Sequence, residues 1–182
     1  MAKPAEILRK FKAKDGREVI LRVPDWGDVD DMLVLINSLV DEGASIVHSR
    51  KVTREEEVDW LGKTLISVEK GDSIAVCAEV EGTIVASSGL SIRSGIRDHT
   101  GEVGLIVRRD HRDLGIGTAI METLVKWGRE MGLELVVLGV FEGNDRARHV
   151  YEKLGFREVG RIPREFHRDG RYFDHVRMVL EL

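Results

Sequence analysis

The stretch from Glu102 to Met131 constrains the fold of this chain more than any other segment, because it joins a strand pattern to a helix pattern through a short basic turn. Residues 102–107 form a short apolar run with β-branched side chains, which is typical of a strand. From Ile116 onward apolar residues recur at helical spacing, and Gly132 stands where the residue after a helix is expected. The segment therefore predicts a strand, a tight turn and a helix in immediate succession.

The turn at residues 108–117 has the composition of an anion-binding site. The first amides of a helix lack intrahelical partners, and the helix dipole adds about half a positive charge there. Gly115 and Gly117 allow backbone amides to approach an anion without an intervening Cβ. Three arginines in the same turn add positive charge. A phosphate or pyrophosphate is the ligand that this pattern favours.

Two other phosphate motifs fit the turn poorly. The chain has no Gly-x-x-x-x-Gly-Lys-Ser/Thr sequence, which argues against a nucleoside-triphosphate loop. A dinucleotide fingerprint needs a third glycine where Ile120 stands, and an acidic residue about 20 positions later, where this chain is apolar. A dinucleotide binder is therefore a minor alternative.

Two motifs in the same order resemble the GCN5-related N-acetyltransferases, the GNAT family. The run Arg-x-x-Gly-Ile-Gly that begins at Arg112 is similar to that family's acetyl-CoA pyrophosphate loop, Arg/Gln-x-x-Gly-x-Gly/Ala. Further along, Asn144 is followed by Tyr151 in the run Tyr-Glu-Lys-Leu-Gly-Phe, which is similar to a later block of the family. The resemblance is clear from Asp72 to the C-terminus and weak before it.

The order of elements agrees with that family's fold. Periodicity and turn signals predict a hairpin over residues 7–23, helices from Asp28 and Thr53, strands over 72–80, 83–92, 102–107 and 133–141, helices from 116 and over 145–154, and a final hairpin of 158–162 with 172–180. We expect one domain spanning residues 1–182. The resemblance implies an α/β (α+β) fold with a mixed, mostly antiparallel sheet, about four helices, and a central strand pair that splays apart around the pantetheine arm of the cofactor.

The resemblance also implies which residues bind acetyl-CoA. Backbone groups of Leu105, Ile106 and Val107 would hold the pantetheine and the acetyl group. Backbone amides of Arg112, Asp113, Leu114, Gly115, Ile116, Gly117 and Thr118 would hold the pyrophosphate. Asn144 would bond the pantetheine, cap the following helix, or do both.

Charged residues around the turn leave alternatives open. Arg108 or Arg109 would reach the 3′-phosphate of the cofactor or remain solvated. Asp113 departs from the family's usual glycine or basic residue, and its carboxylate would disfavour a pyrophosphate unless it points to solvent or pairs with Arg109 or Arg112. The motif itself survives, because it needs only the backbone at that position.

The same resemblance suggests the catalytic groups. Tyr151 is the predicted proton donor to the departing thiolate; the alternative is a tyrosine that packs its helix onto the sheet. Glu102 is the nearest carboxylate in sequence to the proposed acetyl site and the candidate general base, or else an ordinary charge on a strand. Relatives that acetylate protein N-termini carry a Glu where Gly139 stands here. Two alternatives to a side-chain base stay open: a chain of waters carries the proton away, or the amine arrives already neutral.

Composition narrows the remaining classes. A net charge of −4 argues against general nucleic-acid binding, and no apolar stretch approaches the ~18 residues of a membrane span. The N-terminus lacks an apolar signal segment, so we expect a cytoplasmic protein. The six histidines show no metal-ligand spacing, and we expect no metal. The absence of glutamine and the presence of just two asparagines, with many charges, resemble a thermophile composition.

The sequence therefore favours an acetyl-CoA-dependent N-acetyltransferase that acts on a primary amine by direct attack. The acceptor would be a protein N-terminus, an amino acid or analogue, or a polyamine, bound by a wall that the final hairpin and the first two helices form in this family. A homodimer is common among relatives. The alternative from a different class is a catalytically silent CoA-binding module that regulates a partner.

Overall fold

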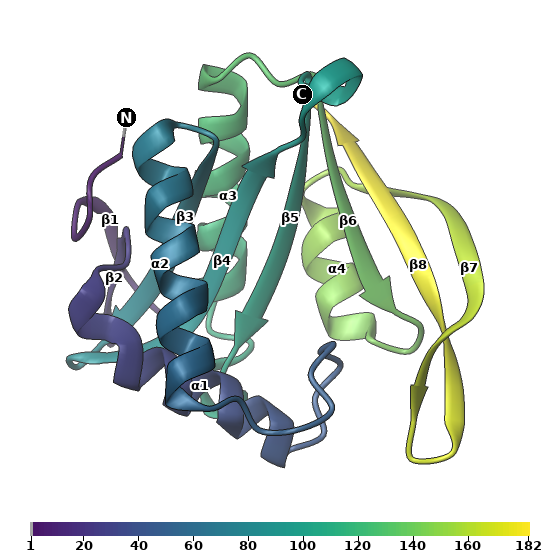
Figure 1. Cartoon of the computed structure of the whole chain (residues 1–182), viewed down its shortest axis with the longest axis horizontal. Coiled ribbons are helices and arrows are strands. Elements are labelled where there is room, and N and C mark those ends of the chain that lie inside the picture. Colours follow the sequence, from purple (N-terminus) through teal and green to yellow (C-terminus); the bar gives the residue numbers. More distant parts are fainter. Residues whose placement is uncertain (1) are drawn as a thin grey trace.

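The structure, a computed structural model, describes residues 2–182 and is built on one eight-stranded sheet with helices on both faces (Figure 1). In chain order the elements are β1 (Ile7–Lys12), β2 (Glu18–Arg22), α1 (Val29–Asp41), α2 (Arg54–Lys70), β3 (Ser73–Val80), β4 (Thr83–Ile92), β5 (Thr100–Val107), α3 (Ile116–Glu130), β6 (Leu135–Phe141), α4 (Asp145–Lys153), β7 (Arg157–Arg168) and β8 (Arg171–Glu181). The predicted fold class is confirmed.

Local signals set several helix ends. Thr53 and Glu56 form a capping box at the start of α2, because each side chain accepts a hydrogen bond from the backbone of the other. The same helix ends at Gly71, whose φ of 79° is the left-handed conformation that glycine adopts without strain. Both signals are local in sequence, and the helix begins after Thr53, as predicted.

The sheet has the strand order β1-β2-β3-β4-β5-β6-β8-β7, and every neighbouring pair is antiparallel except β5 and β6. The parallel pair is short, because its ladder runs from Thr100–Leu135 to Glu102–Val137 and then stops. Beyond that point the two strands diverge, as Figure 1 shows. The expected splay is therefore present, with backbone groups of both strands released from pairing.

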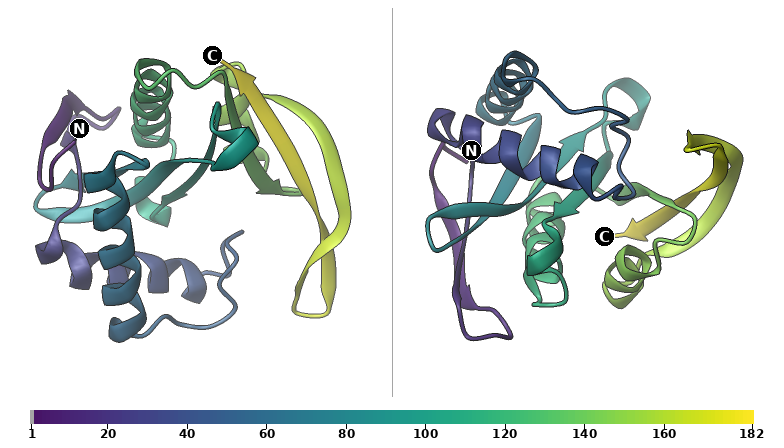
Figure 2. Two further views of the ribbon diagram at one scale, coloured as in Figure 1. Left: turned by 45° about the horizontal axis from the view of Figure 1, so that its top comes forward. Right: turned by 90° about the horizontal axis from the view of Figure 1, so that it is seen from below.

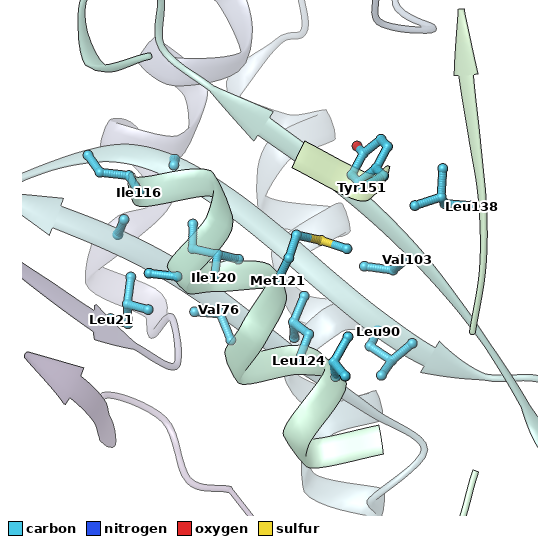
Figure 3. Packing of buried hydrophobic residues seen from close by; sticks show 14 of the residues in the cluster. Leu21, Val76, Leu90, Val103, Ile116, Ile120, Met121, Leu124, Leu138 and Tyr151 are labelled. Carbon is cyan, nitrogen blue, oxygen red and sulfur yellow. The ribbon is translucent and has the colours of Figure 1, made fainter. Parts of the chain in front are cut away.

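The helices divide between the two faces of the sheet. α1 and α2 pack on one face, against β4 and β3, and α3 packs on the other, against β3, β4 and β5 (Figure 2). Ile120, Leu124 and Met121 of α3 are fully buried in the main core, beside Val76 and Leu90 of the sheet (Figure 3). This core fixes the start of α3 against the strand that precedes it.

The final hairpin is longer than the sequence predicted. Strands were expected over residues 158–162 and 172–180, but β7 and β8 extend to a tight turn at Asp169 and Gly170. Pro163 lies within β7, although proline cannot donate to a ladder. The ladder instead shifts register between Ile162 and Phe166 and then resumes as Phe166–Phe173. Within residues 2–182 no helix is long and apolar enough to cross a membrane.

Candidate functional site

The turn before α3 presents a row of unused amides. Gly115 has a φ of 87° and precedes the helix, whose first internal bond runs from the Ala119 amide to the Gly115 carbonyl at 3.0 Å. The six amides of residues 113–118 make no hydrogen bond to any group within residues 2–182. The Arg112 amide, expected to join them, already donates to the Arg109 carbonyl at 3.5 Å. These free donors at a helix N-terminus form a site for an anion.

The two glycines of this turn have different structural roles. Gly115 supplies the left-handed backbone, and a Cβ there would meet nothing within 4 Å. Gly117 lies against β5, where a Cβ would come within 3.2 Å of the Leu105 side chain. Gly115 therefore shapes the turn, whereas Gly117 allows α3 to approach the strand closely.

Side chains of the turn are held by ion pairs that the sequence analysis did not foresee. The Arg112 side chain donates to the Val107 carbonyl at 3.0 Å and also pairs with Glu42 at the end of α1. Of the two alternatives for Asp113, the first holds: its side chain is 65% exposed, and it pairs with Arg146 of α4 at 3.2 Å and not with Arg109 or Arg112. Arg146 thereby neutralises the carboxylate that departed from the family pattern.

A cavity of about 1180 Å³, here called the turn cavity, opens in front of these amides. Every predicted cofactor residue except Ile116 lines it, and the Ile116 side chain lies in the core at 1% exposure. Lys12 and Lys14 of the first hairpin also line it. Together with Arg109 they form no ion pair inside the described part of the chain, so the cavity carries uncompensated positive charge.

Arg108, the other candidate for the 3′-phosphate, is already engaged. Its guanidinium donates to both oxygens of Asp110 at 2.8 Å, and this bond, with the neighbouring His111, holds the pKa of the Asp110 carboxyl well below its usual range. Arg109 is therefore the arginine of the turn that remains free for an anionic ligand. Lys12 and Lys14 escaped the sequence analysis because the first hairpin is far from the motif along the chain.

A second cavity of about 1190 Å³, here called the hairpin cavity, lies on the other side of the splay. Its walls come from α1, α2, β4, β5, β6 and the β7–β8 hairpin. Leu105, Ile106, Asn144 and Tyr151 line both cavities. The two spaces therefore adjoin the same residues, where β5 and β6 part.

Tyr151 is a buried phenol at this junction. Its side chain is 5% exposed, and burial raises the pKa of the phenol to about 12. The ring packs against Phe156, with centroids 5.9 Å apart. Figure 3 shows the hydroxyl directed away from Met121 and Leu138. Tyr151 is therefore packed, as expected if it holds its helix on the sheet, and it also lines both cavities.

The other two predicted polar residues have protein partners. Asn144 caps α4, because its side-chain oxygen accepts from the Ala147 amide at 3.3 Å. This leaves its NH₂ group for a ligand. Glu102 lines the hairpin cavity, but its carboxylate pairs with Arg93 at 3.0 Å and with Arg177 at 3.6 Å. Both guanidinium groups would have to release it before it accepted a proton.

One buried carboxylate faces the hairpin cavity without a partner. Glu57 of α2 is 5% exposed, and burial alone raises the pKa of its carboxyl. It makes no ion pair with any group in residues 2–182. The sequence showed Glu57 as one of three acidic residues in the first turn of a helix, and nothing local distinguishes the one that turns inward.

The profile described as "Acetyltransferase (GNAT) family" matches residues 38–156, which is more than half of the chain. The chain belongs to the GNAT family. As a member it is an N-acetyltransferase with acetyl-CoA as its cosubstrate. Among residues 2–182 no group of three or more His, Cys, Asp or Glu side chains could hold a metal ion.

Individual relatives of this GNAT enzyme are distant. An L-methionine sulfoximine/L-methionine sulfone acetyltransferase of Pseudomonas aeruginosa is 24% identical over 157 residues, 85% of this chain and 90% of that one. A ribosomal-protein-alanine N-acetyltransferase from Brucella melitensis superimposes with a TM-score of 0.79 at 24% identity, covering 89% of this chain and 99% of that one. An acetyltransferase structure from Salmonella typhimurium with acetyl-CoA gives 0.78 at 22% identity, covering 90% and 93%. These structural likenesses establish the fold.

Proposed function

We propose that acetyl-CoA lies along the turn cavity with its thioester between β5 and β6, and that a primary amine in the hairpin cavity attacks it directly. The observation that carries this proposal is that both cavities share Leu105, Ile106 and Tyr151 at the point where the strand ladder stops. Direct attack is sufficient because a thioester is already activated, and holding both reactants together supplies much of the rate. Residues 1–182 act as one domain in this proposal.

The cofactor is held by groups that the fold leaves unpaired. The amides of residues 113–118 bind the pyrophosphate, and Arg109, Lys12 and Lys14 bind the 3′-phosphate. The backbone of 105–107 binds the pantetheine where β6 has moved away, and the Asn144 NH₂ group adds a donor. The six amides make no hydrogen bond within residues 2–182, and Arg109, Lys12 and Lys14 form no ion pair there.

Tyr151 stabilises the departing sulfur by donating a hydrogen bond. A pKa of about 12 keeps the phenol protonated at neutral pH. It also lies above the ~8.5 of an ordinary thiol, so complete proton transfer to the thiolate is unfavourable. A positioned donor that acts on developing charge in a water-poor site contributes about 10²–10³ in rate.

An amino acid or amino-acid analogue fits the hairpin cavity best. The cavity wall carries carboxylates, including Glu57, and guanidinium groups, including Arg177, which together suit a zwitterion. A relative that matches this chain over 90% of its own length is by name an acetyltransferase of two methionine analogues. Protein N-termini and polyamines are the competing acceptor classes in the test.

The test is thiol release from acetyl-CoA over a panel of free amino acids and analogues, peptides with free N-termini, and polyamines. We expect turnover with an amino acid or analogue. Tyr151→Phe should lower kcat about 10²-fold while CoA affinity is kept. Tyr172→Phe is the matched control, because Tyr172 is exposed on β8 and lines neither cavity. Turnover confined to peptides or polyamines would overturn the acceptor class, and no CoA binding would overturn the site.

A further inference from the structure

A histidine fills the space beside a glycine at the splay. Gly139 of β6 has no side chain, and an ideal Cβ built there would lie 1.7 Å from Nε2 of His175. His175 belongs to β8, the strand that pairs with β6 on the side away from β5. The imidazole therefore extends from β8 over β6, and Nε2 is its atom nearest to the Cβ position of Gly139. Any residue other than glycine at position 139 would close this path.

The ring is held in one orientation. Nδ1 of His175 is hydrogen-bonded to the carboxylate of Glu165 on β7. A carboxylate accepts, so the proton of the neutral ring lies on Nδ1, and Nε2 carries the free lone pair. The Phe166 ring packs on the imidazole with centroids 4.8 Å apart, and Phe141 stacks on Phe166. Nε2 has no hydrogen-bond partner within residues 2–182.

This nitrogen lies where the proposed reaction takes place. Gly139 is two residues beyond Val137, the last residue of β6 that pairs with β5. Gly104 is at the equivalent level of β5, and a Cβ there would meet nothing within 4 Å, so the space beside it is open. His175, Glu165 and Tyr151 all line the hairpin cavity. An amine that attacks a thioester held between the strands would therefore approach from the side of Nε2.

We propose that His175 is the general base that removes the proton from the acceptor amine, and that Glu165 is a positioning residue that orients its ring. The inference rests on the proposed function, because it needs the amine in the hairpin cavity. Glu102, the carboxylate chosen from the sequence, is tied to two arginines. His175 instead offers an unused lone pair, and imidazole is the side chain best suited to proton transfer near neutral pH.

The step balances without a further reactant. The neutral amine nitrogen forms a bond to the acetyl carbon, and the nitrogen passes one proton to Nε2 of His175. The carbon–sulfur bond breaks with its electron pair on sulfur, which receives a hydrogen bond from Tyr151. The imidazolium, stabilised by the Glu165 carboxylate, then loses its proton to solvent, and the thiolate takes a proton from solvent. The products are the N-acetylated amine and CoA.

The experiment measures thiol release by His175→Ala, with and without imidazole added to the assay. We expect kcat to fall about 10²-fold at unchanged KM for acetyl-CoA, and added imidazole to restore it in a concentration-dependent way. Glu165→Gln should lower kcat about tenfold and keep that KM. His167→Ala is the control, since His167 is an exposed histidine on β7 of the same hairpin and lines neither cavity.

A second variant tests the geometry without removing the histidine. Gly139→Ala places a methyl group where Nε2 now lies, so it should lower kcat as strongly as His175→Ala, and the double variant should lose no more than either. Gly160→Ala on β7 is its control, because a Cβ there meets nothing within 4 Å.

Four results would overturn the inference. Wild-type kcat in His175→Ala would leave the proposed function standing and remove the base. A loss that imidazole leaves unchanged would make His175 structural. Additive losses with Gly139→Ala would show that the active ring does not lie beside Gly139. Failure of the wild type to acetylate any amine, despite CoA binding, would overturn the proposed function and this inference together.

Discussion

The turn cavity and the hairpin cavity are of nearly equal volume, about 1180 and 1190 Å³, but they are built differently. The turn cavity presents backbone amides of one contiguous segment, residues 113–118, with a few cations around them. The hairpin cavity presents side chains from both sequence halves, such as Glu57, Glu102 and His175. A site made of backbone depends on local conformation, whereas a site made of side chains depends on which distant elements meet.

The largest effect should come from the backbone of the turn cavity. Gly115→Ala forces an alanine into a left-handed conformation at φ 87°, which costs about 1–2 kcal/mol. We expect relaxation of this strain to misplace the free amides and weaken CoA binding about tenfold in isothermal titration calorimetry. Gly132→Ala is the matched control at the other end of α3, with φ 77° and equally open space. Gly132→Ala should lose similar stability and keep its CoA affinity. An equal loss of CoA affinity in both variants would show that the turn before α3 is not the specific cause.

The next effect concerns Tyr151, which belongs to both cavities. Its folded-state pKa of about 12 exceeds the ~10 of an unfolded tyrosine, so its contribution to stability is complete below pH 10 and is lost as pH rises toward 12. Between pH 9 and 11 the wild type should lose about 1 kcal/mol more unfolding free energy than Tyr151→Phe, measured by urea denaturation. Identical losses in the two proteins would mean that the phenol is hydrated in the folded state.

A smaller effect should appear in the hairpin cavity alone. Glu57→Gln removes the inward-facing carboxylate, and we expect KM for the acceptor to rise about fivefold while KM for acetyl-CoA stays the same, because a buried charge-assisted contact contributes about 1 kcal/mol or more. Glu55→Gln is the control from the same helical turn, since Glu55 is exposed. A change in the acetyl-CoA KM would show that the two cavities are not separate binding sites.

The smallest effect should come from a single cation of the turn cavity. Lys14→Ala should weaken CoA about threefold and leave 3′-dephospho-CoA unaffected, because a partly solvated ion pair contributes about 0.2–1 kcal/mol. Lys126→Ala, on the exposed face of α3, is the control. Competition binding at low salt would measure both. An equal loss of affinity for the two ligands would show that Lys14 does not bind the 3′-phosphate.

Much of the fold, and the turn that leaves its amides unpaired, were predictable because their causes are local. The start of α2 after Thr53 and the turn into α3 each depend on residues a few positions apart, and each occurs as predicted. The splay followed from a family resemblance that rests on two local motifs. The free amides follow from the chemistry of any helix N-terminus, wherever the rest of the chain lies.

The remainder was decided by tertiary structure. Periodicity alone did not distinguish Glu57 from its exposed neighbours, because all three lie in one helical turn and only packing against the sheet selects one. Glu102 was chosen by nearness in sequence, yet Arg93 and Arg177 hold it. His175 lies over Gly139 because β8 enters the sheet beside β6, although the two residues are 36 positions apart in the sequence. Sequence determined which groups exist; the sheet order, driven by burial of both faces, determined which of them share a cavity.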